Sequence, residues 1–208
     1  MSTLAPVVLD GRYVRLEPLA PHHVTPLLEA ATGQRTTFGY TWVPDSEAAM
    51  VRYVETALAA QAVGSALPFA VVQQATGFVK GSTRFGNVEF WTWPAGSPNQ
   101  RGEDRPDVVE IGWTWYAPDV QRTGMNTEAK LLLLTHAFET WRVHCVRLMT
   151  DARNDRSRQA ILRLGAAFDG VLRGHRVGAD GTVRHSAAYS VLDAEWPAVK
   201  MRLHSLLR

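Results

Sequence analysis

The sequence predicts a single α/β domain built on a mixed, mostly antiparallel, twisted sheet of six to seven strands flanked by about four helices. Strand-like and helix-like segments follow one another in the order β-α-α-β-β-β-α-β-α-β-β. Hairpins joined by helical crossovers imply a mixed sheet with helices on its faces. The length of 208 residues favours one domain over two, and 46% hydrophobic with 20% charged residues supplies a sizeable core.

The chain begins with a predicted strand and a first helix. A strand is expected over 14–19, where apolar residues alternate with Arg15 and Glu17. Pro21 then opens a helix that runs toward Gly33.

A loop over 34–45 precedes the second predicted helix. Ser46 is a suitable N-cap, and the helix is expected to end near Gly64. One face of it carries Met50, Val54, Ala57 and Leu58.

The hydrophobic period then changes to that of β-structure. Residues 68–74 and 78–91 read as two antiparallel strands with a short turn at 75–77. The Pro- and Gly-rich stretch 94–107 is predicted to be an inserted surface loop, because strand-like sequence resumes directly at 108–116.

The second half of the chain alternates helices and strands. A long helix is predicted from Met125 to Trp141, with Glu128, Lys130 and Glu139 outside its apolar stripe. The stripe consists of Leu131, Leu134, Phe138 and Trp141. Further elements are a strand over 143–151, a helix capped by Asn154 or Asp155 and stopped by Gly165, and closing strands around 168–176 and 183–192.

Charge and cysteine content exclude several classes of function. Twenty-two Lys and Arg against 20 Asp and Glu leave a net charge of +2, too small to indicate a nucleic-acid surface. The single Cys145 excludes an intramolecular disulfide and a Cys-based zinc cage. The seven histidines show no tight ligand spacing, so no metal is expected. Without a secretory or membrane-spanning pattern, the protein is expected to be cytoplasmic, with no membrane partner.

One strand-to-helix turn has the composition of a phosphate site. The segment APDVQRTGMN at 117–126 joins the strand over 108–116 to the long helix and contains Gln121, Gly124 and Asn126. Such a turn exposes N–H groups at the positive end of the helix dipole, where a pyrophosphate is favourably held. The segment lacks the glycines and lysine of a P-loop or a Rossmann fingerprint, so a different phosphate ligand is needed.

Two motifs together resemble a known family. EIGWTWYAPDVQRTGMNTEA at 110–129 and DARNDRSRQAILRLGA at 151–166 are similar to the GNAT superfamily of acyl-CoA N-acetyltransferases, most of all to its RimJ/RimL branch. Q-x-x-G-x-N at 121–126 resembles the family's pyrophosphate loop, and N-x-x-S with A-I-x-x-L-G at 154–165 resembles that branch's second motif. The chain departs from the pattern at Asn126, where Gly or Ala is common, and in its extra length at 94–107.

The resemblance implies a GNAT-like domain over 1–208 with splayed central strands and acetyl-CoA as cosubstrate. Backbone groups at Thr114 to Tyr116 would pair with the pantetheine arm, and N–H groups of 122–127 would hold the pyrophosphate. The residues implied in coenzyme binding are Thr114, Trp115, Tyr116, Gln121, Arg122, Thr123, Gly124, Met125, Asn126, Thr127 and Asn154.

The same resemblance points to catalytic groups. Transfer to an amine needs a base to make the amine neutral and a proton for the departing thiolate. Glu110 is implied as the base, acting through water, and Ser157 as the acid. Tyr189 in the last strand is a competing acid, because a phenol donates at neutral pH.

The acceptor stays open between a protein N-terminal amine and a small-molecule amine. Tyr40, Trp42 and Trp91 are expected to line an acceptor pocket, with core packing as the alternative. A homodimer is a further expectation. The rival functions are a non-catalytic acyl-CoA-binding regulatory module and, on the helix-terminus argument alone, a different nucleotide-binding protein.

Overall fold

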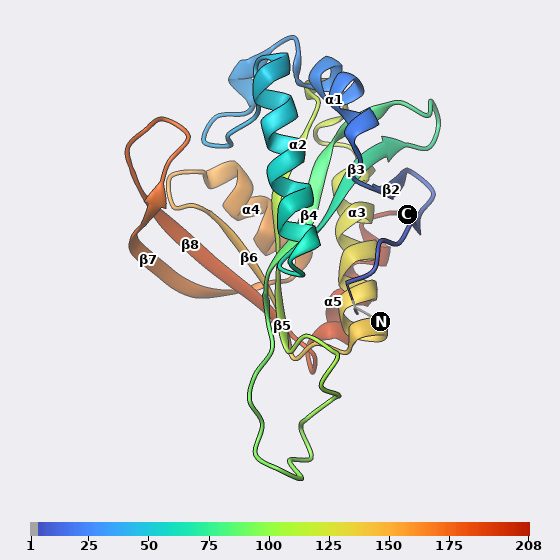
Figure 1. Ribbon diagram of the computed structural model, residues 1–208, viewed down its shortest axis with the longest axis vertical. Coiled ribbons are helices and arrows are strands. Elements are labelled where there is room, and N and C mark those ends of the chain that lie inside the picture. Colours follow the sequence, from blue (N-terminus) through green and yellow to red (C-terminus); the bar gives the residue numbers. More distant parts are fainter. Residues whose placement is uncertain (1–3) are drawn as a thin grey trace.

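The computed structural model describes residues 4–208 (Figure 1), and within them eight strands form one sheet in the order β1-β2-β3-β4-β5-β6-β8-β7. Neighbouring strands in this part of the chain run antiparallel except β5 and β6, which are parallel. The strands are β1 (Leu9–Asp10), β2 (Val14–Pro18), β3 (Leu67–Gln73), β4 (Val79–Glu89), β5 (Val108–Tyr116), β6 (Cys145–Asp151), β7 (Ala167–Val177) and β8 (Val183–Leu192).

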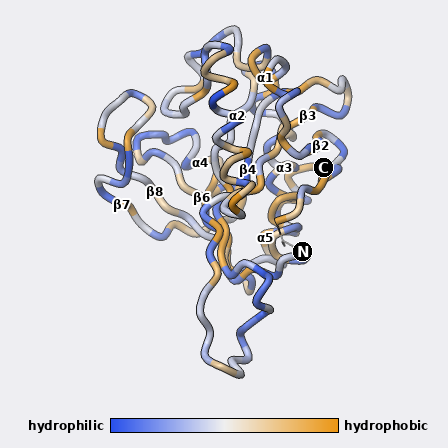
Figure 2. Tube along the Cα trace, viewed as in Figure 1, coloured by the Kyte–Doolittle hydropathy of each residue, from blue (hydrophilic) through white to orange (hydrophobic). Residues whose placement is uncertain are grey.

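Five α-helices cover the sheet. They are α1 (Val24–Ala31), α2 (Glu47–Ala62), α3 (Gly124–Thr135), α4 (Asp155–Leu164) and α5 (Trp196–Ser205). Helix α1 packs on α2 and β4, α3 packs on β2 and α5, and α4 contacts β6. Figure 2 shows hydrophobic residues gathered on the central strands and on α3. The core therefore lies between the sheet and its helices.

Local signals explain where the helices begin and end. The Ser46 hydroxyl accepts from the N–H of Ala49 and caps α2, as predicted. Asn154, and not Asp155, caps α4 by accepting from the N–H of Ser157. Gly165 ends α4 in the left-handed conformation at φ +105°, which suits glycine.

The predicted architecture is confirmed, with corrections at its margins. The sheet gains the two-residue strand β1, and the C-terminal helix α5 was not predicted. The segment from Pro21 begins as a 3₁₀ turn (Pro21–His23) before α1, and the long helix is α3 followed by a π-helical turn, His136–Trp141.

A second correction concerns the charged residues of α3. Glu128 and Lys130 lie outside the apolar stripe in sequence, yet both are buried. The Glu128 carboxylate accepts backbone hydrogen bonds from Arg12, Tyr13 and Val14 at 2.6–2.8 Å, and so ties α3 to the β1–β2 turn. Buried charges persist where such partners satisfy them.

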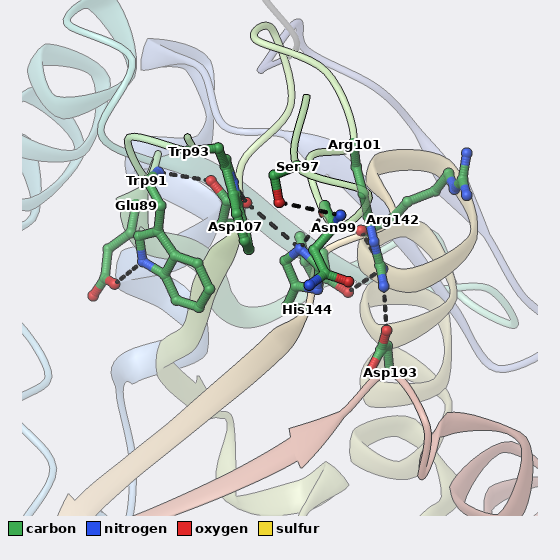
Figure 3. A network of polar contacts seen from close by, with 11 residues as sticks. Glu89, Trp91, Trp93, Ser97, Asn99, Arg101, Asp107, Arg142, His144 and Asp193 are labelled. Atoms are coloured by element: carbon green, nitrogen blue, oxygen red, sulfur yellow. Dashed lines mark hydrogen bonds and ion pairs between the residues drawn. The ribbon is translucent and has the colours of Figure 1, made fainter. Parts of the chain in front are cut away.

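Residues 90–107 leave the sheet as a long excursion between β4 and β5, as expected for 94–107, and project away from the helices (Figure 1). Figure 3 shows how the excursion is held. The buried carboxylate of Asp107 accepts from the backbone N–H of Trp91 at 2.6 Å and from the Trp93 indole at 2.8 Å. Arg101 forms an ion pair with Asp193 beyond β8. The excursion is thus anchored by Asp107 at the start of β5 and by Arg101 at the segment after β8.

Candidate active site

The sheet opens between β5 and β6. The two strands pair only at Val108↔Cys145, Val109↔Val146 and Glu110↔Arg147, after which β6 continues with β8 alone. From Ile111 to Tyr116 the edge of β5 that faces β6 has no strand partner. A cavity of about 810 Å³ occupies this opening, lined by residues of both strands, of α3 and α4, and of the 38–42 loop.

Glu110 stands at the apex of the opening, on the last paired position of β5. It is 5% exposed and lines the cavity. Its Oε2 accepts a 2.7 Å hydrogen bond from the amide of Asn87 on β4. The β4–β5 register shifts between Gly86 and Glu89, and Asn87 there has φ +45°, so a bulge aims this amide at the carboxylate.

The turn predicted to hold phosphate lies at the mouth of the same cavity. After β5 the chain makes a 3₁₀ turn, Pro118–Val120, and enters α3 at Gly124 with Thr123 as N-cap. Gln121, Arg122, Thr123 and Asn126 line the cavity. The leading N–H groups of a helix have no intrahelical acceptor and carry partial positive charge, so this end of the cavity suits an anion.

Some residues predicted for the coenzyme are engaged with the protein itself. The Gln121 amide donates to Thr37 Oγ1 at 3.2 Å and to the Tyr116 carbonyl at 3.0 Å, while its oxygen accepts from Arg156 at 3.1 Å. The side chains of Met125 and Thr127 are buried in the helix packing. For these three residues, any coenzyme contact falls to the backbone.

The start of α4 also lines the cavity. Asn154 and Ser157 both line the cavity, and Asn154 Oδ1 accepts from the Ser157 N–H at 3.1 Å. Arg156 reaches across from α4 to the Thr37 carbonyl. The second motif therefore lines the same cavity as the first, together with Glu110.

Two further residues singled out in the sequence lie elsewhere. Tyr189 is 1% exposed, its hydroxyl accepts from Arg158 Nε at 3.1 Å, and it is not among the residues that line the cavity. Trp91 also lies outside the cavity, stacked on His144 at the base of the excursion (Figure 3). Tyr40 and Trp42, in contrast, are part of the lining.

Lys130 is a cavity residue that sequence reasoning missed. It is 5% exposed, and its ammonium donates to Thr114 Oγ1 at 2.8 Å. Thr114 Oγ1 also lies 2.7 Å from Thr83 Oγ1. Burial lowers the pKa of Lys130 to about 7, so the amine exchanges a proton near neutral pH. Its position on the unexpected inward face of α3 gave no signal in the hydrophobic pattern.

The cavity also holds most of the unsatisfied buried polar atoms. Arg84 Nε, Trp115 Nε1, Tyr116 Oη and Gln61 Oε1 are the buried side-chain atoms of residues 4–208 without a hydrogen-bond partner, and the first three belong to cavity-lining residues. Burial raises the pKa of Tyr116, so its hydroxyl stays a donor. Buried polar atoms normally have hydrogen-bond partners, so these three are exceptions that belong to residues of the cavity lining.

Residues 4–208 contain neither a candidate metal centre nor a candidate membrane-spanning helix. No group of three or more His, Cys, Asp or Glu in residues 4–208 is placed to hold a metal ion. None of the helices in this range combines the length and hydropathy needed to cross a membrane.

Solved structures resemble the chain over nearly its whole length. A GCN5-related N-acetyltransferase from Brucella melitensis superposes with a TM-score of 0.82 at 29% identity, covering 98% of this chain and 86% of the other. A candidate acetyltransferase from T. thermophilus superposes at 0.77 with 33% identity, covering 98% of each chain. RimJ of Mycobacterium smegmatis, solved with CoA-disulfide, shares the fold at 0.76 with 20% identity, covering 99% and 97%.

No curated protein matches the chain. A family profile, in contrast, does match it and agrees with the solved structures. The profile described as "Acetyltransferase (GNAT) domain" matches residues 14–167, which span β2 to the start of β7 and include both cavity motifs. The chain belongs to the GNAT acetyltransferase family.

Proposed function

We propose that the protein transfers acetyl from acetyl-CoA to a primary amine by direct attack in a ternary complex. The observation that carries the proposal is the opening between β5 and β6, which joins a buried carboxylate, an anion-binding helix terminus and an 810 Å³ cavity in one space. Neighbours of the same fold hold the expected coenzyme: RimJ of M. smegmatis was solved with CoA-disulfide and the microcin C7 self-immunity protein with acetyl-CoA and AMP.

The coenzyme fits the free edge of β5. Its amide-bearing pantetheine arm would pair with the backbone of Thr114 to Tyr116 as a missing strand does, since β6 leaves this edge unpaired. The pyrophosphate would sit on the N–H groups of 122–127, with Arg122 adding charge.

Starting from the ammonium form of the acceptor, the nitrogen loses two protons, and the departing thiolate takes up one. Glu110, through water, would accept the first proton, so that the neutral amine attacks the thioester carbonyl. The C–N bond forms, the C–S bond breaks, and the coenzyme leaves as a thiolate. Ser157 would protonate this thiolate and would be reprotonated by the second proton of the attacking nitrogen. Ser157 is favoured over Tyr189 because it lines the cavity, whereas the Tyr189 hydroxyl is buried against Arg158.

The acceptor would enter beside the aromatic loop. Tyr40 and Trp42 line the cavity at 37% and 57% exposure, so their rings are accessible to an arriving amine. Trp91 was also expected to contact the acceptor, but it lies outside this space. The variants Trp91→Ala and Trp42→Ala are compared to test the two residues. Only Trp42→Ala is expected to raise the KM of the acceptor.

The proposal is tested by calorimetric binding of acetyl-CoA and CoA beside ATP and NADPH, on protein first freed of carried-over ligand. Selective coenzyme binding together with thiol release on addition of amines supports an acetyltransferase. Coenzyme binding without thiol release across a broad panel of amines and peptide N-termini supports the regulatory module instead. Tighter binding of ATP or NADPH overturns the coenzyme assignment.

The base is tested by Glu110→Gln. This variant keeps the shape and the Asn87 contact but removes the proton acceptor, so kcat is expected to fall about 10²- to 10⁴-fold with an unchanged Kd for acetyl-CoA. Equal turnover of the variant and the wild type at every pH would remove Glu110 from the mechanism. Ser157→Ala and Tyr189→Phe, compared in the same assay, separate the two candidate acids.

A further inference from the structure

Arg84 is a buried cation in the cavity without an anionic partner. The residue lies on β4, is 5% exposed and lines the cavity. No hydrogen bond or ion pair to its guanidinium occurs within residues 4–208, and its Nε is fully buried. Its contacts are the rings of Tyr53 and Trp113, whose centroids lie 5.1 and 5.0 Å from Cζ.

Burying a guanidinium that has no hydrogen-bond partner costs free energy unless a bound ligand supplies the partner. A guanidinium stays charged in proteins, so it cannot escape desolvation by losing its proton. The two aromatic rings stabilise the charge but accept none of its in-plane N–H donors. The donors of a planar fork match the two oxygens of a carboxylate. The residue is therefore preorganised for an anion that is absent from the protein itself.

The acids that share the cavity already have partners. Glu110 accepts from Asn87, and Asp151 is paired with Arg153 at 2.8 Å. Arg176 and Arg184 add further positive charge to the lining, and burial lowers the pKa of Arg184. The positive charge of this part of the cavity thus exceeds what its own carboxylates balance.

The phosphates of the coenzyme are not the expected partner of Arg84. Arg84 is opposite Gly112 in the sheet, and β5 continues from there to Tyr116 before the 121–126 turn begins. On β4 the partner of Tyr116 is Gly81, three residues before Arg84, which is about 10 Å at about 3.3 Å per residue. On its other side Arg84 lies two residues from Gly86, the partner of Glu110, and so at the end of the opening where the proposed base is located.

We infer that the acceptor of this enzyme is an amine that also carries a carboxylate, and that Arg84 binds this carboxylate. The inference rests on the proposed function, because it names the class of acceptor for the same site. Arg84 then acts as a specificity residue, while Glu110 handles the proton of the amine.

The first test compares amines that differ only in the carboxylate. The probes are the L-amino acids, glycine, β-alanine, 4-aminobutyrate and 5-aminovalerate, each beside its carboxamide, and O-phosphoethanolamine as a phosphate-bearing control. The wild type is expected to acetylate at least one carboxylate ten- to a hundredfold faster, in kcat/KM, than its carboxamide. In Arg84→Met this ratio is expected to fall to near one, with partial recovery in Arg84→Lys.

The second test does not depend on turnover. Binding of the corresponding N-acetyl amino acids and their amides is measured by calorimetry on protein saturated with CoA, using wild type, Arg84→Met and Arg147→Met. Arg147 is the matched control, because it lies on β6 outside the cavity and pairs with Glu89. The wild type and Arg147→Met are expected to prefer the carboxylates at least tenfold, and Arg84→Met is expected to lose this preference while still binding CoA.

Several outcomes would overturn the inference. Equal handling of carboxylates and carboxamides, a preference for O-phosphoethanolamine, or a preference that survives in Arg84→Met each contradicts it, as does a failure of every carboxylate in both tests. If Arg84→Met lowered kcat equally for a carboxylate and for its carboxamide, Arg84 would instead act in the chemical step. Arg84-dependent carboxylate binding without any thiol release would count against the proposed function while the carboxylate site stands.

Discussion

At the scale of single residues, the side chain of Lys130 has a different pKa in the folded protein and in the unfolded chain. Its ammonium has one hydrogen bond, to Thr114, and no carboxylate partner within residues 4–208. Burial therefore lowers its pKa to about 7, whereas an exposed lysine titrates near 10.4. Between these two pH values the unfolded chain holds a proton that the folded protein has released.

This difference predicts how stability depends on pH. Where the unfolded state binds more protons, stability rises with pH, so the wild type should gain up to about 1.4 kcal/mol per pH unit above pH 7 relative to Lys130→Met. Urea unfolding at pH 7, 8 and 9 measures the two slopes. Burial raises the pKa of Cys145 to about 11, whereas a thiol in the unfolded chain titrates near 8.5, so Cys145 lowers both slopes equally and cancels in their difference.

A surface lysine supplies the matched control. Lys200 is paired with Glu139 at 2.6 Å and is 36% exposed, so Lys200→Met should keep the slope of the wild type. Parallel slopes for the wild type and Lys130→Met would contradict the lowered pKa.

At the scale of elements, two bulges shape the site. Register shifts in the β4–β5 pair coincide with left-handed backbone at Asn87 and at Trp113, φ +45° and +50°. A bulge leaves a residue unpaired and turns its side chain. Here the first presents an amide to Glu110, and the second places the Trp113 ring against Arg84. Both cavity groups thus depend on the irregularity of two neighbouring strands.

The first bulge is tested by Asn87→Gly. Glycine adopts φ +45° without strain, so the backbone should stay while Glu110 loses its hydrogen bond. We expect kcat to fall about three- to tenfold, because the lost bond no longer holds the carboxylate in place. The Kd of acetyl-CoA should not change.

A second substitution approaches the same carboxylate from the other strand. A Cβ added at Gly112 would lie 2.9 Å from Glu110 Oε1, so Gly112→Ala should also lower kcat without weakening coenzyme binding. An Asn87→Gly enzyme with the kcat of the wild type would show that this hydrogen bond does not position Glu110.

These elements also mark how far the sequence alone could predict the protein. The cap at Ser46, the hairpin of β3 and β4 and the 121–126 turn rest on local signals, and each was predicted. The cap of α4 was narrowed to Asn154 or Asp155, and the structure has Asn154. The burial of Lys130 and Glu128 could not be predicted, because it depends on Thr114 and on the backbone of 12–14, which only the fold brings near. The bulges likewise follow from strand register. Helix α5 did carry a signal, since Trp196, Val199 and Leu203 share one buried face.

At the scale of the whole molecule, the cavity and the excursion over 90–107 are separate polar regions. The polar residues of the cavity come from β4, β5, α3 and α4. The excursion is centred on Asp107, which sits at the start of β5 with Trp91, Trp93 and His144 around it (Figure 3). Asp107 and these aromatic residues are not among those that line the cavity. We therefore expect that the anchor of the excursion can be lost without changing the cavity.

Asp107→Ala tests this separation. The variant gives up two hydrogen bonds to a buried carboxylate, and the removal of that buried charge offsets part of the loss, so stability should fall by about 2–3 kcal/mol. Limited proteolysis should become faster within 94–106, while the Kd of acetyl-CoA and the rate of thiol release stay within twofold of the wild type. Asp104→Ala, an exposed change in the same excursion, should leave both stability and proteolysis unaltered. If Asp107→Ala weakened the affinity for acetyl-CoA and Asp104→Ala did not, the excursion would be coupled to the cavity. Trp91 would then again be a candidate for acceptor binding.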